Sequence, residues 1–250
     1  MRLLLTNDDG IESKALHILA KELEKNHELI IAAPSVQRSA CSHSITISEP
    51  LIIKNVDLPD IKSKAFSISG TPADCVRVAI HKLLNKPIDM VISGTNMGTN
   101  LGMDIIYSGT VSAAIEAAIY KIPSIAISAE LNNNCGNYNS AAKFASKIIK
   151  IAEDNSIKND LVINVNVPCL TEEEIKGIQV CEMGRKTYDN YFVESIDKNG
   201  NMNLKLSGRI NTKHIENTDI YYLKKGYVTV TPLHYDLTNF KILSAVSNWF

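Results

Sequence analysis

The chain has 250 residues, of which 45% are hydrophobic and 21% charged, and its formal net charge at pH 7 is −1. These values fit one globular α/β unit, and the near-neutral charge argues against a nucleic-acid polymer or a membrane surface as partner. No apolar run reaches the ~18 residues of a transmembrane helix, and the N-terminus lacks the pattern of a signal peptide.

Strands and helices are predicted to alternate over the first two thirds of the chain. Buried strands are expected at 2–6, 28–33, 88–93, 124–128 and 161–166, and extended segments near 45–48, 51–56 and 65–69. Apolar residues at helical spacing predict helices at 13–25, 72–84, 110–121 and 139–153. Thr71 is expected as an N-cap, with Pro72 at the first helical position. This alternation predicts a Rossmann-like α/β fold, with a mostly parallel sheet and helices on both of its faces.

A different pattern follows Pro168. Asn199-Gly200 lies between two extended stretches, 191–196 and 202–206, and predicts a β-hairpin. A strand at 227–231 and an amphipathic terminal helix follow. We therefore expect a single domain, 1–250, that consists of a core (about 1–183 plus 226–236), a hairpin appendage (about 185–225) and a C-terminal helix (about 239–250). The hairpin and the helix suit subunit contacts, and packing on the chain's own core is the alternative.

The strongest chemical signal is the acidic pair Asp8-Asp9, directly after the first strand. In an open parallel sheet, ligands bind beyond the carboxyl ends of the strands. Adjacent carboxylates there can hold a hard divalent cation, which oxygen ligands suit best. The alternative is a simple turn, because Asn7-Asp8-Asp9-Gly10 is rich in turn-forming residues.

Two further segments are expected at the same edge of the sheet. The loop Gly94–Gly102 has glycines at four-residue spacing, which lets backbone approach an anion, and the amide oxygen of Asn96 can complete a metal shell. Ser108, Gly109 and Thr110 begin a helix, whose free N–H groups and dipole favour phosphate. Each segment alone is also compatible with an ordinary loop or cap, so the prediction of a ligand site depends on their convergence.

A polar loop after the second strand, residues 35–44, is expected at this edge as well. The Ser39 hydroxyl can coordinate a cation, Arg38 or His43 can contact a phosphate, and Ser42 is a candidate substrate contact. A solvated loop without a ligand is the alternative interpretation.

These segments resemble the SurE family of metal-dependent 5′/3′-nucleotidases, also called stationary-phase survival proteins, over essentially the whole chain. The motifs that carry the resemblance are Asn7–Gly10, Arg38-Ser39, Gly70–Cys75, Ser93–Gly102, Tyr107–Ala114 and Thr231–Asp236. One departure lies in the polar loop, where Ala40-Cys41 follows Ser39 and many members have Gly.

The resemblance implies one divalent metal ion per subunit, Mg²⁺ or Mn²⁺, held by Asp8, Asp9, Ser39 and Asn96. It implies a phosphomonoesterase, a 5′-nucleotidase that hydrolyses nucleoside 5′-monophosphates, with 3′-monophosphates and short polyphosphate as further substrates. It also implies a homodimer or homotetramer built through the C-terminal segments. The scattered cysteines, without C-x-x-C, add the expectation of reduced thiols in a cytoplasmic protein.

The mechanism we expect is direct hydrolysis at phosphorus, in which Asp8 or Asp9 orients or deprotonates water. Asn96 and the helix start at Ser108–Thr110 are expected to hold the phosphate in line. Which carboxylate does so stays open, and a covalent aspartyl phosphate is less favoured. His234, near a strand end, is a candidate proton donor to the leaving group. The alternative function is a non-catalytic nucleotide- or phosphate-binding module, or a receiver-like signalling domain. A receiver needs an acceptor Asp at a later strand end, where this chain has Ser69-Gly70 and Ser93-Gly94.

Overall fold

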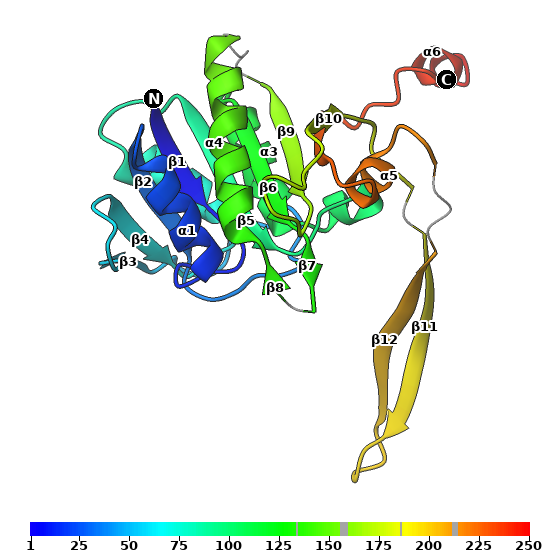
Figure 1. Ribbon diagram of the computed structural model, residues 1–250. Coiled ribbons are helices and arrows are strands. Elements are labelled where there is room, and N and C mark those ends of the chain that lie inside the picture. The colour runs from blue at the N-terminus through cyan, green and yellow to red at the C-terminus, as the bar shows by residue number, and fades with distance from the viewer. Residues whose placement is uncertain (134, 156–159, 186, 212–214) are drawn as a thin grey trace.

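The computed structural model describes residues 1–133, 135–155, 160–185, 187–211 and 215–250. Its strands are β1 (Arg2–Thr6), β2 (Glu28–Pro34), β3 (Ile53–Val56), β4 (Lys64–Ile68), β5 (Met90–Met97), β6 (Ser124–Ala129), β7 (Leu131–Asn132), β8 (Cys135–Gly136), β9 (Val162–Val167), β10 (Ile178–Val180), β11 (Thr187–Ile196), β12 (Met202–Asn211) and β13 (Val228–Leu233). Its helices are α1 (Lys14–Leu23), α2 (Pro72–Val78), α3 (Gly109–Ile119), α4 (Tyr138–Asp154), α5 (Asp219–Lys224) and α6 (Leu243–Ser247), with the short helical turns η1 (Ala79–Leu83) and η2 (Gly102–Ile106). Figure 1 shows their arrangement.

The central sheet has nine strands in the order β10-β13-β9-β6-β5-β1-β2-β4-β3. Its six middle strands, from β9 to β4, run parallel, while β3 pairs antiparallel with β4 and β13 pairs antiparallel with β9. After β1 the chain moves outward to β2 and β4, and from β5 it moves the other way to β6 and β9. The order therefore reverses between β1 and β5, where doubly wound sheets bind their ligands. The predicted Rossmann-like fold class is confirmed.

Helices cover both faces of the sheet, and β1 shows why. Leu3, Leu4 and Leu5 are all fully buried. Successive side chains of a strand point to opposite faces, so a strand buried on both sides has a continuous apolar run. Leu3 and Leu5 belong to the apolar cluster that α1 and α4 complete, and Leu4 belongs to the one with α2 and α3. The core therefore consists of two layers that hold the strand ends in place.

The start of α2 is fixed by a capping box. Thr71 Oγ1 accepts a hydrogen bond from the Asp74 backbone N–H (3.1 Å), and the Thr71 N–H donates to Asp74 Oδ2 (2.9 Å). Pro72 occupies the first helical position, where its missing N–H costs nothing. The predicted cap is confirmed, and it places α2 next to the polar loop.

The C-terminal third differs in part from expectation. The hairpin around Asn199-Gly200 is present, with Ile196 opposite Met202, and it extends away from the sheet as an arm (Figure 1). However, β10 and α5 are structured parts that the sequence patterns did not predict, and no strand forms at 45–48. Residues 186 and 212–214, within the range assigned to the hairpin appendage, lie outside the described part of the chain.

The terminal helix is shorter than predicted, since only α6 of the range 239–250 is helical. It has no side-chain cap and buries no residue in this chain, and a short helix without packing has little stability of its own. Among the described residues, none of the helices has the length and apolar character needed to cross a bilayer.

Candidate active site

A cleft of about 780 Å³ lies at the carboxyl edge of the sheet, at the ends of β1 and β5. Its lining residues are Asp8, Ser39, Ala40, Asn96, Met97, Gly98, Thr99, Asn100, Asp104, Tyr107, Ser108, Leu206 and Ser207. The cleft therefore brings together parts of all four predicted segments, namely Asp8 of the acidic pair, the polar loop, the glycine loop and the start of α3, although Asp9 itself does not line it. Asp104, Leu206 and Ser207 were not predicted: no motif marks them, and only the fold brings the hairpin to this edge.

Asp8 is almost fully buried, with 5% of its surface exposed. Its Oδ1 accepts a hydrogen bond from Thr110 Oγ1 at 2.6 Å, and Oδ2 accepts a longer one from the Thr110 N–H at 3.3 Å. Desolvation raises the pKa of Asp8 from 3.8 to about 6; the bonds from Thr110 oppose this rise, while the charge of Asp9 adds to it. A positive charge bound close to Asp8 would favour its ionised form.

Asp9 extends the acidic pair toward the glycine loop. Its Oδ2 accepts a hydrogen bond from the Met97 N–H (2.8 Å), and its Oδ1 accepts one from Gln37 Nε2 (3.1 Å). Burial raises the pKa of Asp9 as well, against the effect of these two bonds. Both aspartates lie within a turn from Asn7 to Gly10, in which the Asn7 side chain donates to the Gly10 carbonyl and accepts from the Gly10 N–H. The turn is therefore present. It positions the two carboxylates and does not exclude a ligand-binding role for them.

Asn96 lies where β5 bends. The pairing of β5 with β6 shifts register between Ser93 and Asn96. Gly94, at φ +144°, passes so close to β6 that an added Cβ would lie 2.4 Å from the Ile127 carbonyl oxygen, so only glycine fits there. The Asn96 amide nitrogen donates to the Gly98 carbonyl (2.8 Å), which leaves the amide oxygen available as a ligand.

The start of α3 approaches Asp8 closely. A Cβ at Gly109 would lie 2.9 Å from both Asp8 Cβ and Cys41 Sγ, so glycine permits the contact. Ser108 is the N-cap, and its Oγ accepts the Val111 N–H (3.1 Å). Among the described residues, the Gly109 N–H has no hydrogen-bond acceptor, as is usual in the first turn of a helix, and such a group can bind an anion.

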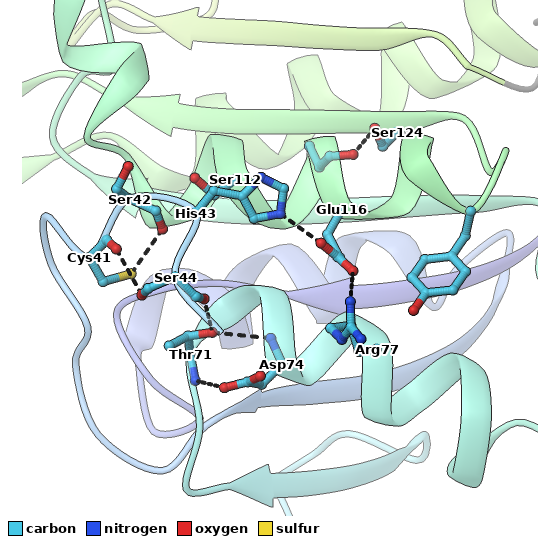
Figure 2. Close-up of polar contacts among 12 residues, drawn as sticks. Cys41, Ser42, His43, Ser44, Thr71, Asp74, Arg77, Ser112, Glu116 and Ser124 are labelled. Carbon is cyan, nitrogen blue, oxygen red and sulfur yellow. Dashed lines mark hydrogen bonds and ion pairs between the residues drawn. The ribbon is translucent and has the colours of Figure 1, made fainter. Parts of the chain in front are cut away.

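The polar loop contributes less to the cleft than its composition suggested. Ser39 is exposed and lines the cleft. Arg38, Ser42 and His43 do not line it: Arg38 Nη2 donates to the Ser69 carbonyl (2.8 Å) and Ser42 Oγ donates to the Ile106 carbonyl (2.7 Å). His43 points to Glu116 of α3, as Figure 2 shows. These three side chains fix the loop in this structure, in contrast to the predicted contacts of Arg38 or His43 with phosphate.

His234 lies at the opposite edge of the sheet. Because β13 runs antiparallel to β9, its last residue, Leu233, pairs with Val162 at the amino end of β9. Tyr235 lies two residues after Leu233, and its hydroxyl accepts a hydrogen bond from Lys121 Nζ (2.8 Å) at the far end of α3. The suggestion that His234 protonates the leaving group is therefore wrong for a site formed within one chain.

The donor set at the cleft suits a hard divalent cation. It offers two carboxylates, one amide oxygen and one hydroxyl (Asp8, Asp9, Asn96 and Ser39), which are oxygen ligands of the kind that Mg²⁺ and Mn²⁺ take. Burial raises the pKa of Asp8, and a bound cation would favour its ionised form. Among the described residues, no three or more His, Cys, Asp or Glu side chains cluster in a way that could hold a metal ion.

A second hollow, of about 810 Å³, lies at the amino edge of the sheet. Two of its cationic residues form ion pairs, Arg2 with Glu28 (3.0 Å) and Lys21 with Asp60 (2.8 Å). The carboxyl-edge cleft, which contains the buried Asp8 carboxylate, is the stronger candidate.

The fold and the cleft define a doubly wound α/β protein with an acidic pair and a helix N-terminus at the switch point of its sheet. Comparison with known proteins specifies it further. The family described as "Survival protein SurE" matches residues 3–190. The 5′-nucleotidase SurE of Clostridium tetani is 61% identical over 250 residues, covering 100% of both chains. That of Clostridium botulinum (strain ATCC 19397 / Type A) is 55% identical over 251 residues, covering 100% of this chain and 99% of its own.

A solved structure of a SurE protein supports the same family assignment as the sequence relatives. The crystal structure of the SurE protein from Aquifex aeolicus superposes with a TM-score of 0.87 at 38% identity, covering 100% of this chain and 99% of its own. The chain belongs to the SurE family.

Proposed function

We propose that this protein is a 5′-nucleotidase, a divalent-metal-dependent phosphomonoesterase that hydrolyses nucleoside 5′-monophosphates to nucleoside and phosphate. The activity is the one for which its full-length relatives are named. The observation that carries the proposal is the contact of Asp8 with Thr110: it joins the acidic pair to an anion-binding helix start at the switch point.

In the proposed mechanism, Asp8, Asp9, Ser39 and Asn96 hold one divalent cation, which when bound supplies Lewis-acid neutralisation of phosphoryl charge. The free Gly109 N–H, at the positive end of α3, binds the phosphate and holds it in line. One carboxylate of the pair orients the attacking water and accepts its proton. Because Asp8 is held by Thr110 while Asp9 faces Met97, the two have different surroundings, and the choice between them stays open.

The wall of the cleft offers a place for the nucleoside. Tyr107 and Leu206 line the cleft and expose 62% and 59% of their surfaces. Exposed apolar and aromatic groups beside a polar centre suit a base or sugar, and aromatic faces stack on any base. This arrangement favours a nucleotide over a small phosphate ester.

The test is phosphate release from a panel of nucleoside monophosphates with Mg²⁺, with Mn²⁺ and with EDTA. We expect metal-dependent release that EDTA abolishes, and a loss of at least a hundredfold in Asp9→Asn. Asp60→Asn is the matched control, since Asp60 is an exposed acid whose partner is Lys21 at the far edge. Folded protein that releases no phosphate with either metal would refute the proposal and favour a binding module.

We also propose one structural unit that assembles as a homodimer or homotetramer through the C-terminal segments. The hairpin exposes Phe192 (59%) and Leu204 (53%), and the C-terminal segment exposes Trp249 (73%). Apolar side chains gathered on protruding segments are typical of subunit contacts. Light scattering after gel filtration tests the assembly. A cytoplasmic location is proposed on the free thiols of Cys41, Cys75 and Cys181; the side chain of Cys135 lies outside the described residues.

A further inference from the structure

The polar loop, residues 35–44, is held in a conformation that its own sequence does not favour. Ala40 and Ser42 have φ angles of 53° and 52°. Left-handed backbone at residues with a Cβ is strained, and it persists where surrounding contacts determine it. The segment that carries Ser39 therefore depends on the contacts that flank it.

Those contacts join the loop to the turn after β1 on one side, and to α3 and the turn before it on the other. On the N-terminal side, the Arg38 N–H donates to the Asp8 carbonyl (2.7 Å). On the C-terminal side, the Ser42 N–H donates to the Tyr107 carbonyl (3.0 Å), and His43 Nε2 bonds Glu116 Oε2 at 2.6 Å. The loop thus follows the first two turns of α3, with Ser39 between its two attachments.

Glu116 is an unusual anchor, because its side chain is only 3% exposed. Arg77 of α2 holds its other oxygen, with Nη1 at 3.0 Å from Oε1. Figure 2 shows His43 and Arg77 converging on the two oxygens of this one carboxylate from different elements. Without His43, Oε2 loses its partner in a buried position, and a hydrogen bond to a charged group shifts an equilibrium by roughly tenfold or more.

We propose that His43 is a positioning residue: through Glu116 it holds the polar loop against α3 and thereby sets the place of Ser39 and the affinity of the cleft for its divalent cation. This inference rests on the proposed metal-binding role of Ser39. His43 itself does not line the cleft. A purely structural pair would instead stabilise the packing of α2 on α3 and leave cation binding unchanged.

The test compares His43→Asn with His43→Gln. Both replacements are neutral amides, but the glutamine amide nitrogen extends about as far from Cα as Nε2 of histidine, whereas that of asparagine is one methylene short. Mn²⁺ binding is measured without substrate, by electron paramagnetic resonance of free Mn²⁺. Hydrogen exchange of the peptide spanning the loop is measured in parallel. We expect roughly tenfold weaker Mn²⁺ binding and faster loop exchange in His43→Asn, and values within about twofold of wild type in His43→Gln.

Wild-type Mn²⁺ affinity in His43→Asn would overturn the inference, even if the variant melts at a lower temperature. Equal losses in the two variants would overturn it as well. Should His43→Asn fail to fold, Glu116→Gln replaces it: this variant keeps the volume, removes the charge that His43 meets, and is expected to weaken Mn²⁺ binding in the same direction. Unchanged binding in Glu116→Gln would contradict the proposal.

The proposed function is tested separately by the wild type. A wild type that binds no Mn²⁺ would refute the metal site and this inference together. A wild type that binds Mn²⁺ but releases no phosphate from nucleotides would refute the activity alone, and the comparison of the His43 variants would keep its meaning.

Discussion

The raised pKa of Asp8 predicts that the metal-free protein loses stability as the pH rises. Burial moves this pKa from 3.8 to about 6 in the folded state. Between these two values the folded protein binds more protons than the unfolded chain, so the free energy of unfolding falls with increasing pH. At 1.36 kcal/mol per pH unit, the full loss is about 3 kcal/mol, of which about 2 kcal/mol falls between pH 4 and 7.5.

The assay is urea denaturation in EDTA at several pH values, for the wild type and for Asp8→Asn. The variant has no proton to release at this position, so its stability should exceed that of the wild type by an amount that grows by about 2 kcal/mol over this range. Asp9, whose pKa is also raised, contributes a decline of the same sign that remains in the variant. Saturating Mn²⁺ should restore the wild type above pH 6 and affect the variant much less.

Parallel pH curves for the wild type and Asp8→Asn would refute the reasoning. They would mean that Asp8 is as well solvated in the folded protein as in the unfolded chain. A wild type whose free energy of unfolding increases with pH would contradict it more strongly. A positive slope would mean that the folded protein already stabilises the ionised carboxylate without metal.

Three further outcomes are expected. Thr110→Val removes the 2.6 Å hydrogen bond to Asp8, so the pKa of Asp8 should rise further, by about one unit. The stability of the metal-free protein should then depend more steeply on pH, and Thr110→Ser, which keeps the hydroxyl, is the control. Gly109→Ala places a Cβ 2.9 Å from Asp8 Cβ, so the free energy of unfolding in urea should fall by about 1–3 kcal/mol and the rate of phosphate release at least tenfold. A variant with wild-type stability and rate would show that α3 does not approach Asp8 this closely. Tyr107→Ala should raise KM for nucleotides several-fold and leave hydrolysis of glycerol 2-phosphate unchanged, and an equal effect on both would argue against a nucleoside contact.

Local sequence signals predicted much of the scaffold and part of the site. The capping box of Thr71 and Asp74 and the Asn199-Gly200 turn are properties of a few adjacent residues, and both are present. The position of Asp8 and Asp9 after an apolar strand placed them at the carboxyl edge. Short elements escaped prediction, because α5 and β10 have too few residues to produce a clear period.

Contacts between distant residues could not be read from local pattern. Glu116 was seen only as part of an apolar helix, and its pairing with His43, 73 residues away, depends on how α3 packs against the polar loop. Leu206 reaches the cleft only because the hairpin arm begins beside it. Strand direction could not be read from local pattern either. Because β13 runs antiparallel to β9, His234 lies at the edge of the sheet opposite the cleft.

The sequence by itself determined which oxygens are available, which strand carries them and where helices begin, because caps, turns and apolar periods act over a few neighbouring residues. The tertiary structure alone decided that Thr110 bonds Asp8 across 102 residues, that the Met97 N–H meets Asp9 across 88, and that burial raises the pKa of both acids. Those properties arise from strand order and desolvation, and both exist only once the whole sheet has formed.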